Sequence, residues 1–259
     1  MKIAVSGKGG VGKTLVAGSL ACLFVREGLK TMAIDADPSP NLALTLGLTP
    51  EEARDIVPIS ENRRLISSKT DTEYSGVYRL SFTVDDVVKD FSVKTPCNVN
   101  LIVMGIVRSM GSGCTCPANA VVKALLRHLI VERDEAVILD MEAGVEHLGR
   151  GTARHVDIML IVAESSIKSL ETAKHIHKLA SDAGIRRILL LGNKVANEAQ
   201  KRAIKKYADN NGLGLLGFVP FDVKLAEAET LVESPLKLAD SEAVQTIQKL
   251  GVNLLQPTQ

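Results

Sequence analysis

The sequence lacks an excess of charge of either sign, and it lacks any long apolar run. Its 259 residues include 31 Lys and Arg against 30 Asp and Glu, which leaves a formal charge of +1. Because the two signs nearly cancel, the protein has no strong electrostatic attraction to nucleic acid or anionic lipid. No apolar stretch reaches the roughly 18 residues that a membrane span requires. We therefore expect neither a nucleic-acid partner nor a membrane partner.

Cysteine is scarce, with four in the chain, and the start of the sequence shows no secretory leader. After Met1 and Lys2 the sequence runs directly into apolar residues, without the charged segment, apolar run and cleavage site of a signal peptide. We therefore expect a cytoplasmic protein, in a compartment where thiols stay reduced. Closely spaced cysteines in such a protein more often bind metal or do redox chemistry than form disulfides.

Short apolar runs alternate along the chain with longer helical patterns. The runs lie at residues 3–5, 31–34, 101–104, 136–139, 158–163, 188–191 and 215–219, and the helical patterns near 13–27, 118–133, 168–183 and 197–210. Strands that are apolar throughout are typical of a parallel sheet covered on both faces. The alternation predicts an α/β fold with a doubly wound, mostly parallel sheet.

We expect residues 1–259 to form a single domain with an elaborated segment at about 49–97. The 46% hydrophobic content gives ample material for one core. The segment 49–97 breaks the alternation and holds one short helical patch, Val84–Phe91. Gly28 stands where a left-handed residue would end the first helix. Apolar residues at helical spacing over 240–255 predict a final docked helix.

The stretch SGKGGVGKT, residues 6–14, follows the first expected strand and opens the first expected helix. Within it Gly7, Gly12, Lys13 and Thr14 satisfy the GxxxxGK[ST] pattern of a phosphate-binding loop. Glycines let backbone N–H groups surround phosphate oxygens, the lysine neutralises the β- and γ-phosphate charge, and the threonine hydroxyl binds Mg²⁺. A glycine turn without a ligand is the alternative, which the flanking strand and helix disfavour.

A second lysine, Lys8, lies at the entry of this loop. Lys13 already supplies the cation that a nucleotide bound to this loop requires. Lys8 is therefore available for a second nucleotide. The stretch KGGVGKT resembles the deviant Walker A motif of the MinD, ParA and nitrogenase-iron-protein class of ATPases. The resemblance implies that Lys8 reaches phosphates bound by the partner of a dimer, although a solvated loop lysine remains the alternative. It also implies a nucleotide-binding set of Gly9, Gly10, Val11, Gly12, Lys13, Thr14 and Leu15.

Two carboxylate motifs end expected strands. In AIDADPSPN, Asp35 and Asp37 lie at the carboxyl edge, where ligands of open α/β sheets bind. Both face one side of an extended segment and could approach a hydrated Mg²⁺ or an attacking water, or else form a turn. The class resemblance favours Asp37 for positioning water, and we expect Asp35 and Asn41 in the first switch.

The second motif, VILDMEAGVEHLGRG, ends its strand at Asp140. This is a Walker B and second-switch arrangement, in which Asp140 holds a Mg²⁺ water and Gly144 swings its N–H toward the γ-phosphate. Thr14, Asp37 and Asp140 thus form the expected magnesium set. The fragment DMEAGVEHLGRGT narrows the resemblance to the CooC family, the ATPases that assist nickel insertion into carbon monoxide dehydrogenase, and to related acetyl-CoA synthase maturation factors. The class pattern further implies adenine contacts from Asn193 and the Val219–Pro220 turn, although Asn193 could equally be a turn residue at a strand end.

Cys114 and Cys116 lie one residue apart in GSGCTCPANA. In an extended segment both thiols point the same way and offer two soft ligands, whereas Ni²⁺ and Zn²⁺ sites take four. A twofold axis near the pair would supply the partner's two thiolates, and the CooC family binds metal at such a CxC motif between subunits. Incidental buried thiols are the alternative. Cys22, among apolar neighbours in the first helix, reads as a core residue, and we assign Cys97 no chemistry.

The sequence therefore predicts a homodimeric ATPase that uses ATP and Mg²⁺, binds Ni²⁺ or Zn²⁺ at Cys114 and Cys116, and serves carbon monoxide dehydrogenase or acetyl-CoA synthase. Two other classes stay open. One is a positioning or partition ATPase that acts on surfaces, and the other is an iron–sulfur reductase of the nitrogenase-iron-protein kind.

Overall fold

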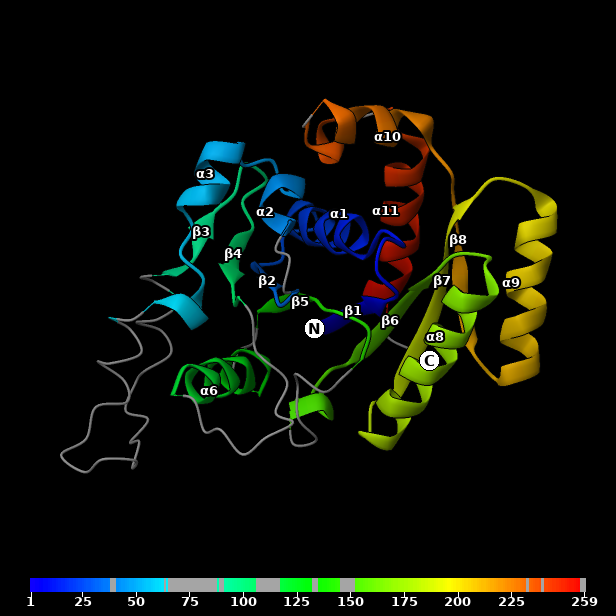
Figure 1. Cartoon of the computed structure of the whole chain (residues 1–259), viewed down its shortest axis with the longest axis horizontal. Coiled ribbons are helices and arrows are strands. Elements are labelled where there is room, and N and C mark those ends of the chain that lie inside the picture. Colours follow the sequence, from blue (N-terminus) through cyan, green and yellow to red (C-terminus); the bar gives the residue numbers. More distant parts are fainter. Residues whose placement is uncertain are drawn as a thin grey trace.

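The computed structural model describes residues 1–37, 41–62, 64, 88, 91–105, 117–131, 135–144, 152–231, 233–238 and 240–256. Its described strands form one eight-stranded sheet in the order β3-β4-β2-β5-β1-β6-β7-β8 (Figure 1). The strands are β1 (Lys2–Gly7), β2 (Thr31–Asp35), β3 (Val93–Lys94), β4 (Asn100–Val103), β5 (Ala136–Asp140), β6 (Ile158–Ala163), β7 (Arg187–Val195) and β8 (Gly214–Pro220). Every described pairing is parallel except that of β3 with β4.

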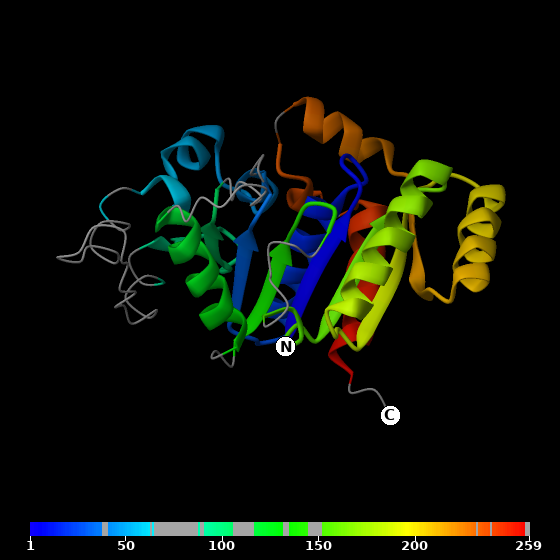
Figure 2. The same cartoon turned by 60° about the horizontal axis from the view of Figure 1, so that its bottom comes forward.

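Helices cover both faces of this sheet, as the doubly wound prediction requires (Figure 1, Figure 2). One face carries α1 (Lys13–Arg26), α2 (Leu42–Thr45) and α11 (Glu242–Leu255) over one apolar cluster. The other carries α6 (Pro117–Val131), α8 (Ile167–Asp182) and α9 (Glu198–Asn211) over a second cluster. The central strands β2, β5 and β6 are buried at every residue, which explains why they are apolar throughout.

Local signals set the ends of several helices. Gly28 adopts a left-handed φ of 83° just beyond α1, and its N–H donates to the Val25 carbonyl. Helices α8 and α11 begin at Ser166 and Ser241, whose side chains accept the N–H of the residue three positions on. The predicted end of the first helix and the predicted final helix are therefore confirmed.

The described part of the segment 49–97 holds more secondary structure than the sequence indicated. It contains α3 (Pro50–Asp55), a 3-10 turn (Ile59–Glu61) and the antiparallel edge strand β3. A capping box between Thr49 and Glu52 starts α3. Most of the predicted patch Val84–Phe91 lies outside the described residues. The sequence reading also missed α2 and α10 (Val223–Thr230), which are too short for a clear apolar period.

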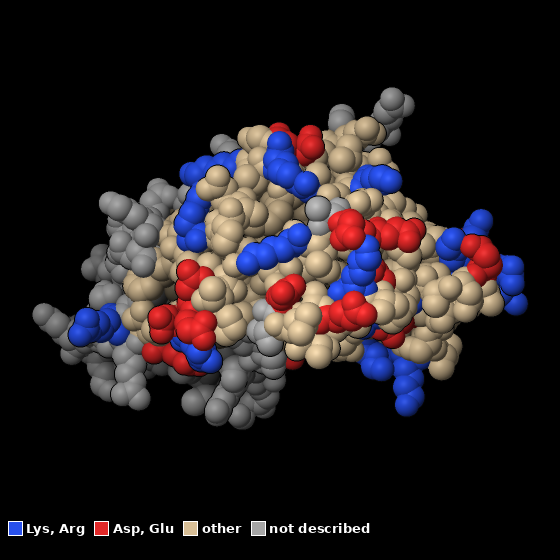
Figure 3. All heavy atoms as spheres, turned by 90° about the horizontal axis from the view of Figure 1, so that it is seen from above, with Lys and Arg blue, Asp and Glu red and all other residues tan. Residues whose placement is uncertain are grey.

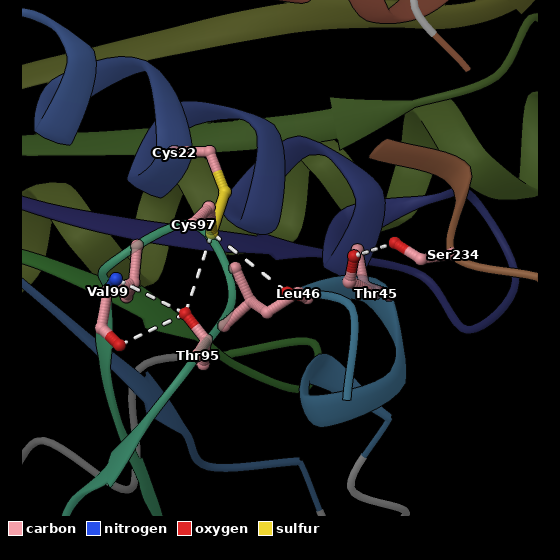
Figure 4. Close-up of a disulfide and its surroundings, with 7 residues drawn as sticks. All are labelled: Cys22, Thr45, Leu46, Thr95, Cys97, Val99 and Ser234. Carbon is pink, nitrogen blue, oxygen red and sulfur yellow. Dashed lines mark hydrogen bonds between the residues drawn. A yellow bond between two sulfur atoms is a disulfide. The ribbon is translucent and has the colours of Figure 1, made fainter. Parts of the chain in front are cut away.

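The sequence analysis missed a bond between two cysteines. Cys22 is a buried residue of α1, as predicted, but its sulfur is bonded to that of Cys97 in a disulfide (Figure 4). The expectation that thiols stay reduced therefore does not hold for this pair. The two residues are 75 positions apart, and packing of α1 against the turn between β3 and β4 brings them together. A contact so distant along the chain leaves no signal in local spacing.

Charge and hydropathy agree with the composition. Lys and Arg side chains alternate with Asp and Glu side chains among the described residues on the face that Figure 3 shows. Within the part of the chain that the structure describes, no helix is long and apolar enough to cross a membrane.

Candidate functional site

The ends of three neighbouring strands bring the predicted motifs to one edge of the sheet. Strand β5 lies between β1 and β2, and Asp140 is the register partner of both Val5 and Asp35. Residues in register on parallel strands point to the same face. Both carboxylates therefore lie on the face covered by α1 and α2, at the edge where the loop after β1 lies (Figure 2).

Two glycines of the phosphate loop leave no room for a side chain. A Cβ on Gly7 would lie 2.3 Å from the Val162 carbonyl oxygen, and one on Gly12 would lie 2.4 Å from the Asn193 amide nitrogen. Gly12 also adopts a left-handed φ of 93° as it starts α1. The loop thus fits closely against β6 and β7, and its amide groups approach the N-terminus of a 14-residue helix, a place suited to a phosphate.

Lys13 is buried, with 7% of its surface exposed, and its ammonium lies within the loop. The nitrogen is 3.4 Å from the Lys8 carbonyl oxygen and 3.9 Å from an Asp37 carboxylate oxygen. Lys8 itself is exposed, and no described residue pairs with its ammonium. The two lysines of one loop therefore differ, since one serves the interior of this chain and the other faces outward.

Asp140 is buried with 0% exposure, and neither carboxylate oxygen has a hydrogen-bond partner among the described residues. Burial raises the pKa of Asp140 to about 6, and the Thr14 hydroxyl and the Lys13 ammonium oppose that rise. The Thr14 hydroxyl acts on this carboxylate without forming a well-aligned hydrogen bond. A buried carboxylate with unused lone pairs beside a hydroxyl is a donor set that fits Mg²⁺.

Asp35 has a different environment, because both of its carboxylate oxygens accept backbone N–H groups. One oxygen accepts the N–H of Leu42 at 2.9 Å, and the other accepts the N–H of Asp37 at 3.2 Å. Burial and the neighbouring Asp140 raise the pKa of Asp35 to about 7. Asp35 therefore holds the start of α2, just after Asn41, whereas Asp37 remains beside Lys13.

The second-switch loop is hydrogen-bonded to Ser6, a residue to which the sequence analysis assigned no role. The Ser6 hydroxyl donates to the Glu142 carbonyl at 2.6 Å and accepts the Gly144 N–H at 3.2 Å. The Gly144 N–H that we expect to swing toward a γ-phosphate thus rests on Ser6 in this structure. Ser6 is the first letter of the quoted phosphate-loop stretch, but nothing in its spacing pointed to the other loop.

The carboxyl end of β7 supports the phosphate loop through two side chains. The Asn193 amide donates to the Val11 carbonyl at 2.7 Å, and the Lys194 ammonium donates to the Gly10 carbonyl at 2.7 Å. Lys194 also lies 3.4 Å from Glu164 and has a left-handed φ of 55°, which is uncommon for lysine. Sequence reasoning missed Lys194, and its position directly after Asn193 was the available signal.

The adenine contacts stay predictions. Asn193 is buried against the phosphate loop. The Val219 side chain is fully buried in the cluster under α1 and α11, so Val219 can offer only its backbone, with Pro220 beside it at the strand end.

The predicted metal pair, Cys114 and Cys116, lies outside the described residues. Among the residues that the structure does describe, no group of three or more His, Cys, Asp or Glu side chains could hold a metal ion. The CxC hypothesis therefore rests on the sequence.

Comparison with known proteins agrees with this arrangement. The family model of the CobQ/CobB/MinD/ParA nucleotide binding domain matches residues 2–234. An uncharacterised ATP-binding protein of Methanocaldococcus jannaschii is 44% identical over 253 residues, which cover 96% of each chain. The carbon monoxide dehydrogenase accessory protein CooC of Rhodospirillum rubrum is 44% identical over 231 residues, which cover 88% of this chain and 87% of CooC.

The fold has a solved counterpart. The cell division protein MinD of Aquifex aeolicus, solved in complex with MinC, superimposes with a TM-score of 0.72 at 19% identity, over 100% of this chain and 98% of that one. Eight strands in mostly parallel order with helices on both faces are therefore the architecture of a MinD-like P-loop protein.

Proposed function

Because the chain belongs to the CobQ/CobB/MinD/ParA nucleotide-binding family, we propose that it is a homodimeric, Mg²⁺-dependent ATPase that assists nickel insertion into carbon monoxide dehydrogenase or acetyl-CoA synthase. The observation that carries the enzymatic part is the Asp140 carboxylate, which is buried beside the phosphate loop and has no hydrogen-bond partner within the described part of the chain. The 44% identity to CooC supports the nickel part.

The residues around Asp140 divide the work of hydrolysis. The N–H groups of residues 9–15 and the Lys13 ammonium bind the β- and γ-phosphates, and α1 directs its positive end at them. Asp140 and Thr14 would hold Mg²⁺, which supplies charge neutralisation at the phosphates. Asp37, 3.9 Å from Lys13, orients the attacking water from the first-switch side.

The second-switch loop would then change its position according to whether a γ-phosphate is bound. The Gly144 N–H has one described partner, the neutral Ser6 hydroxyl, at 3.2 Å. A phosphate oxygen is charged and accepts a stronger hydrogen bond than a hydroxyl does. Gly144 therefore exchanges Ser6 for the γ-phosphate when ATP binds and returns to Ser6 after hydrolysis.

Dimer formation would complete both centres. The exposed Lys8 reaches phosphates on the partner, and two Cys114–Cys116 pairs supply four thiolates for Ni²⁺, or for Zn²⁺ in its place. Because ATP favours the closed dimer, nucleotide state and metal affinity are linked.

The ATPase part is tested by substituting the two loop lysines separately. Lys13→Ala should abolish ATP binding and hydrolysis together. Lys8→Ala should keep ATP binding by the single chain and lose hydrolysis, because the charge it removes acts on the partner's nucleotide. Full hydrolysis by Lys13→Ala contradicts the assignment of an ATPase, and full hydrolysis by Lys8→Ala contradicts the shared site.

The metal part is tested by stoichiometry. Purified protein should bind half a Ni²⁺ per chain, with an affinity that differs between ADP and a non-hydrolysable ATP analogue, and Cys114→Ala with Cys116→Ala should remove that binding. Cys97→Ala is the matched control, because it removes one thiol and keeps both cysteines of the CxC motif. Unchanged nickel binding in the double variant contradicts the metal site, and stoichiometric iron with sulfide would instead indicate an iron–sulfur reductase.

A further inference from the structure

We propose that Cys22 and Cys97 form a redox modification site whose oxidation restrains the first-switch segment, residues 41–48. The effect on turnover rests on the proposed ATPase function, whereas the effect on the segment does not. The other cysteine pair, Cys114 and Cys116, plays no part in this inference.

The bridge joins the helix of the phosphate loop to the turn between β3 and β4 (Figure 4). Cys22 lies nine residues after Lys13 in α1, and the Cα atoms of Cys22 and Cys97 are 5.7 Å apart. A helix transmits displacement along its length because its backbone is hydrogen-bonded throughout. A restraint at Cys22 therefore also restrains the end of α1 that carries Lys13 and Thr14.

The first-switch segment is packed between the two joined elements. The Cys97 sulfur lies 4.0 Å from the carbonyl oxygen of Leu46, the residue that ends α2. On the α1 side, a Cβ on Gly18 would lie 2.8 Å from the Thr45 methyl group, so helix and segment are in close contact. On the turn side, Gly47 packs against the Pro96 ring.

Both ends of the segment are also tied to the rest of the chain. The Leu42 N–H donates to the Asp35 carboxylate at 2.9 Å, and the Ser234 hydroxyl donates to the Thr45 carbonyl at 2.7 Å (Figure 4). These hydrogen bonds can break and re-form when the switch moves, whereas a disulfide cannot. Oxidation therefore replaces a packed contact between α1 and the turn with a fixed one.

The chemistry is thiol–disulfide exchange with a low-molecular-weight disulfide. Cys97 is half-buried and Cys22 is 8% exposed, so the Cys97 thiolate is the first to attack. It bonds to one sulfur of the reagent and releases the other as a thiolate. The Cys22 thiolate then attacks the Cys97 sulfur and releases the second thiolate. The two protein thiols lose two electrons and two protons, and the reagent is reduced to two thiols.

The test compares the full chain after treatment with oxidised glutathione and after dithiothreitol. Differential alkylation with peptide mass spectrometry should show Cys22 and Cys97 bonded in the first sample and alkylated in the second. Oxidation should slow amide hydrogen exchange in residues 41–48 and lower ATP turnover about fivefold, a typical size for coupling between two sites, with reversal by dithiothreitol. The Kd for ATP should change little, because the phosphate loop keeps its contacts.

Cys97→Ser is the matched control, since it cannot form the bridge but keeps Cys114 and Cys116. Its exchange and turnover should be the same in both treatments, and Cys22→Ser should behave in the same way. Cys22 and Cys97 that stay alkylatable under oxidant overturn the proposal, as does a bridge that leaves hydrogen exchange of residues 41–48 unchanged. Absence of hydrolysis in both redox forms would instead contradict the ATPase function, and the exchange measurement would still decide this inference.

Discussion

The ends of β2 and β5 look alike in sequence, but they have different chemistry. Each is an apolar strand that ends in aspartate, and Asp35 and Asp140 are register partners on one face of the sheet. Asp35 accepts two backbone N–H groups, whereas the Asp140 carboxylate accepts none from the residues that the structure describes. A buried carboxylate with its hydrogen bonds made acts as a support, and one without them is a site for a cation.

The loops that follow the two strands explain this difference. After β2, the chain turns back into α2 and brings the Leu42 N–H onto Asp35. After β5, the Glu142 carbonyl and the Gly144 N–H are hydrogen-bonded to the Ser6 hydroxyl. The backbone groups of Glu142 and Gly144 therefore do not bind the Asp140 carboxylate. The same residue type at the same sheet edge therefore acquires its role from the path of the next few residues.

The largest effect is expected at Asp140. Asp140→Asn should lower ATP turnover about a thousandfold, or about 4 kcal/mol of transition-state stabilisation, because the amide is a poor ligand for Mg²⁺. Without Mg²⁺ and nucleotide, the variant should be at least as stable as the wild type, because it removes an unpaired buried charge. Steady-state kinetics and urea unfolding measure the two effects. A variant that keeps turnover, or that unfolds more easily than the wild type, would make Asp140 a support like Asp35.

Asp35→Ala should show the opposite pattern. Measured at about pH 4, where ionisation of the buried carboxyl contributes little, it removes the acceptor of two backbone N–H groups and should lower the free energy of unfolding by about 2 to 3 kcal/mol. Asp35→Asn keeps one acceptor oxygen and should cost about half as much. Urea unfolding of both variants tests this order. Equal stability of wild type and Asp35→Ala would show that the two hydrogen bonds do not hold α2.

The two raised pKa values predict how stability depends on pH without metal and nucleotide. Burial raises the pKa of Asp35 to about 7 and that of Asp140 to about 6, from 3.8. Between about pH 4 and these values, the folded chain holds protons that the unfolded chain has lost. The free energy of unfolding should therefore fall as pH rises, by about 1.4 kcal/mol per pH unit for each group.

The asparagine variants separate the two contributions. In unfolding curves recorded with EDTA, Asp140→Asn should remove the fall up to about pH 6, and Asp35→Asn the fall up to about pH 7. Identical pH slopes in wild type and both variants would show that neither carboxylate holds its proton in the folded chain.

A smaller effect is expected at the end of β7. There Lys194, like Asp35, has its polar group bound to other residues of the chain. Lys194→Met removes the hydrogen bond to Gly10 and the ion pair with Glu164, and should raise the Kd for ATP about fivefold, or about 1 kcal/mol. Lys201→Met is the control, since Lys201 is equally exposed and pairs with Glu198 on its own helix. An equal Kd in wild type and Lys194→Met would show that the phosphate loop holds its shape unaided.

Features encoded over a few residues were the ones that the sequence could predict. The apolar strands, the long helices and the phosphate loop with its glycines each have a local pattern. The roles of Asp35, Ser6 and Lys194 depend on partners from other strands, and the Cys22–Cys97 bond depends on packing 75 residues apart. The similar sequences AIDAD and VILDM gave no sign that Asp35 and Asp140 have different hydrogen-bond partners. The residues next to an aspartate in the sequence do not show which groups its carboxylate binds.

The register of the parallel strands β2 and β5 also limits how the lengths of these strands can change in evolution. Asp35 and Asp140 sit directly across from each other, and strand side chains alternate between faces. A one-residue deletion in either strand would turn its carboxylate toward α6, into apolar packing and away from the nucleotide. The number of residues from Thr31 to Asp35 and from Ala136 to Asp140 is therefore as constrained as the residue types themselves.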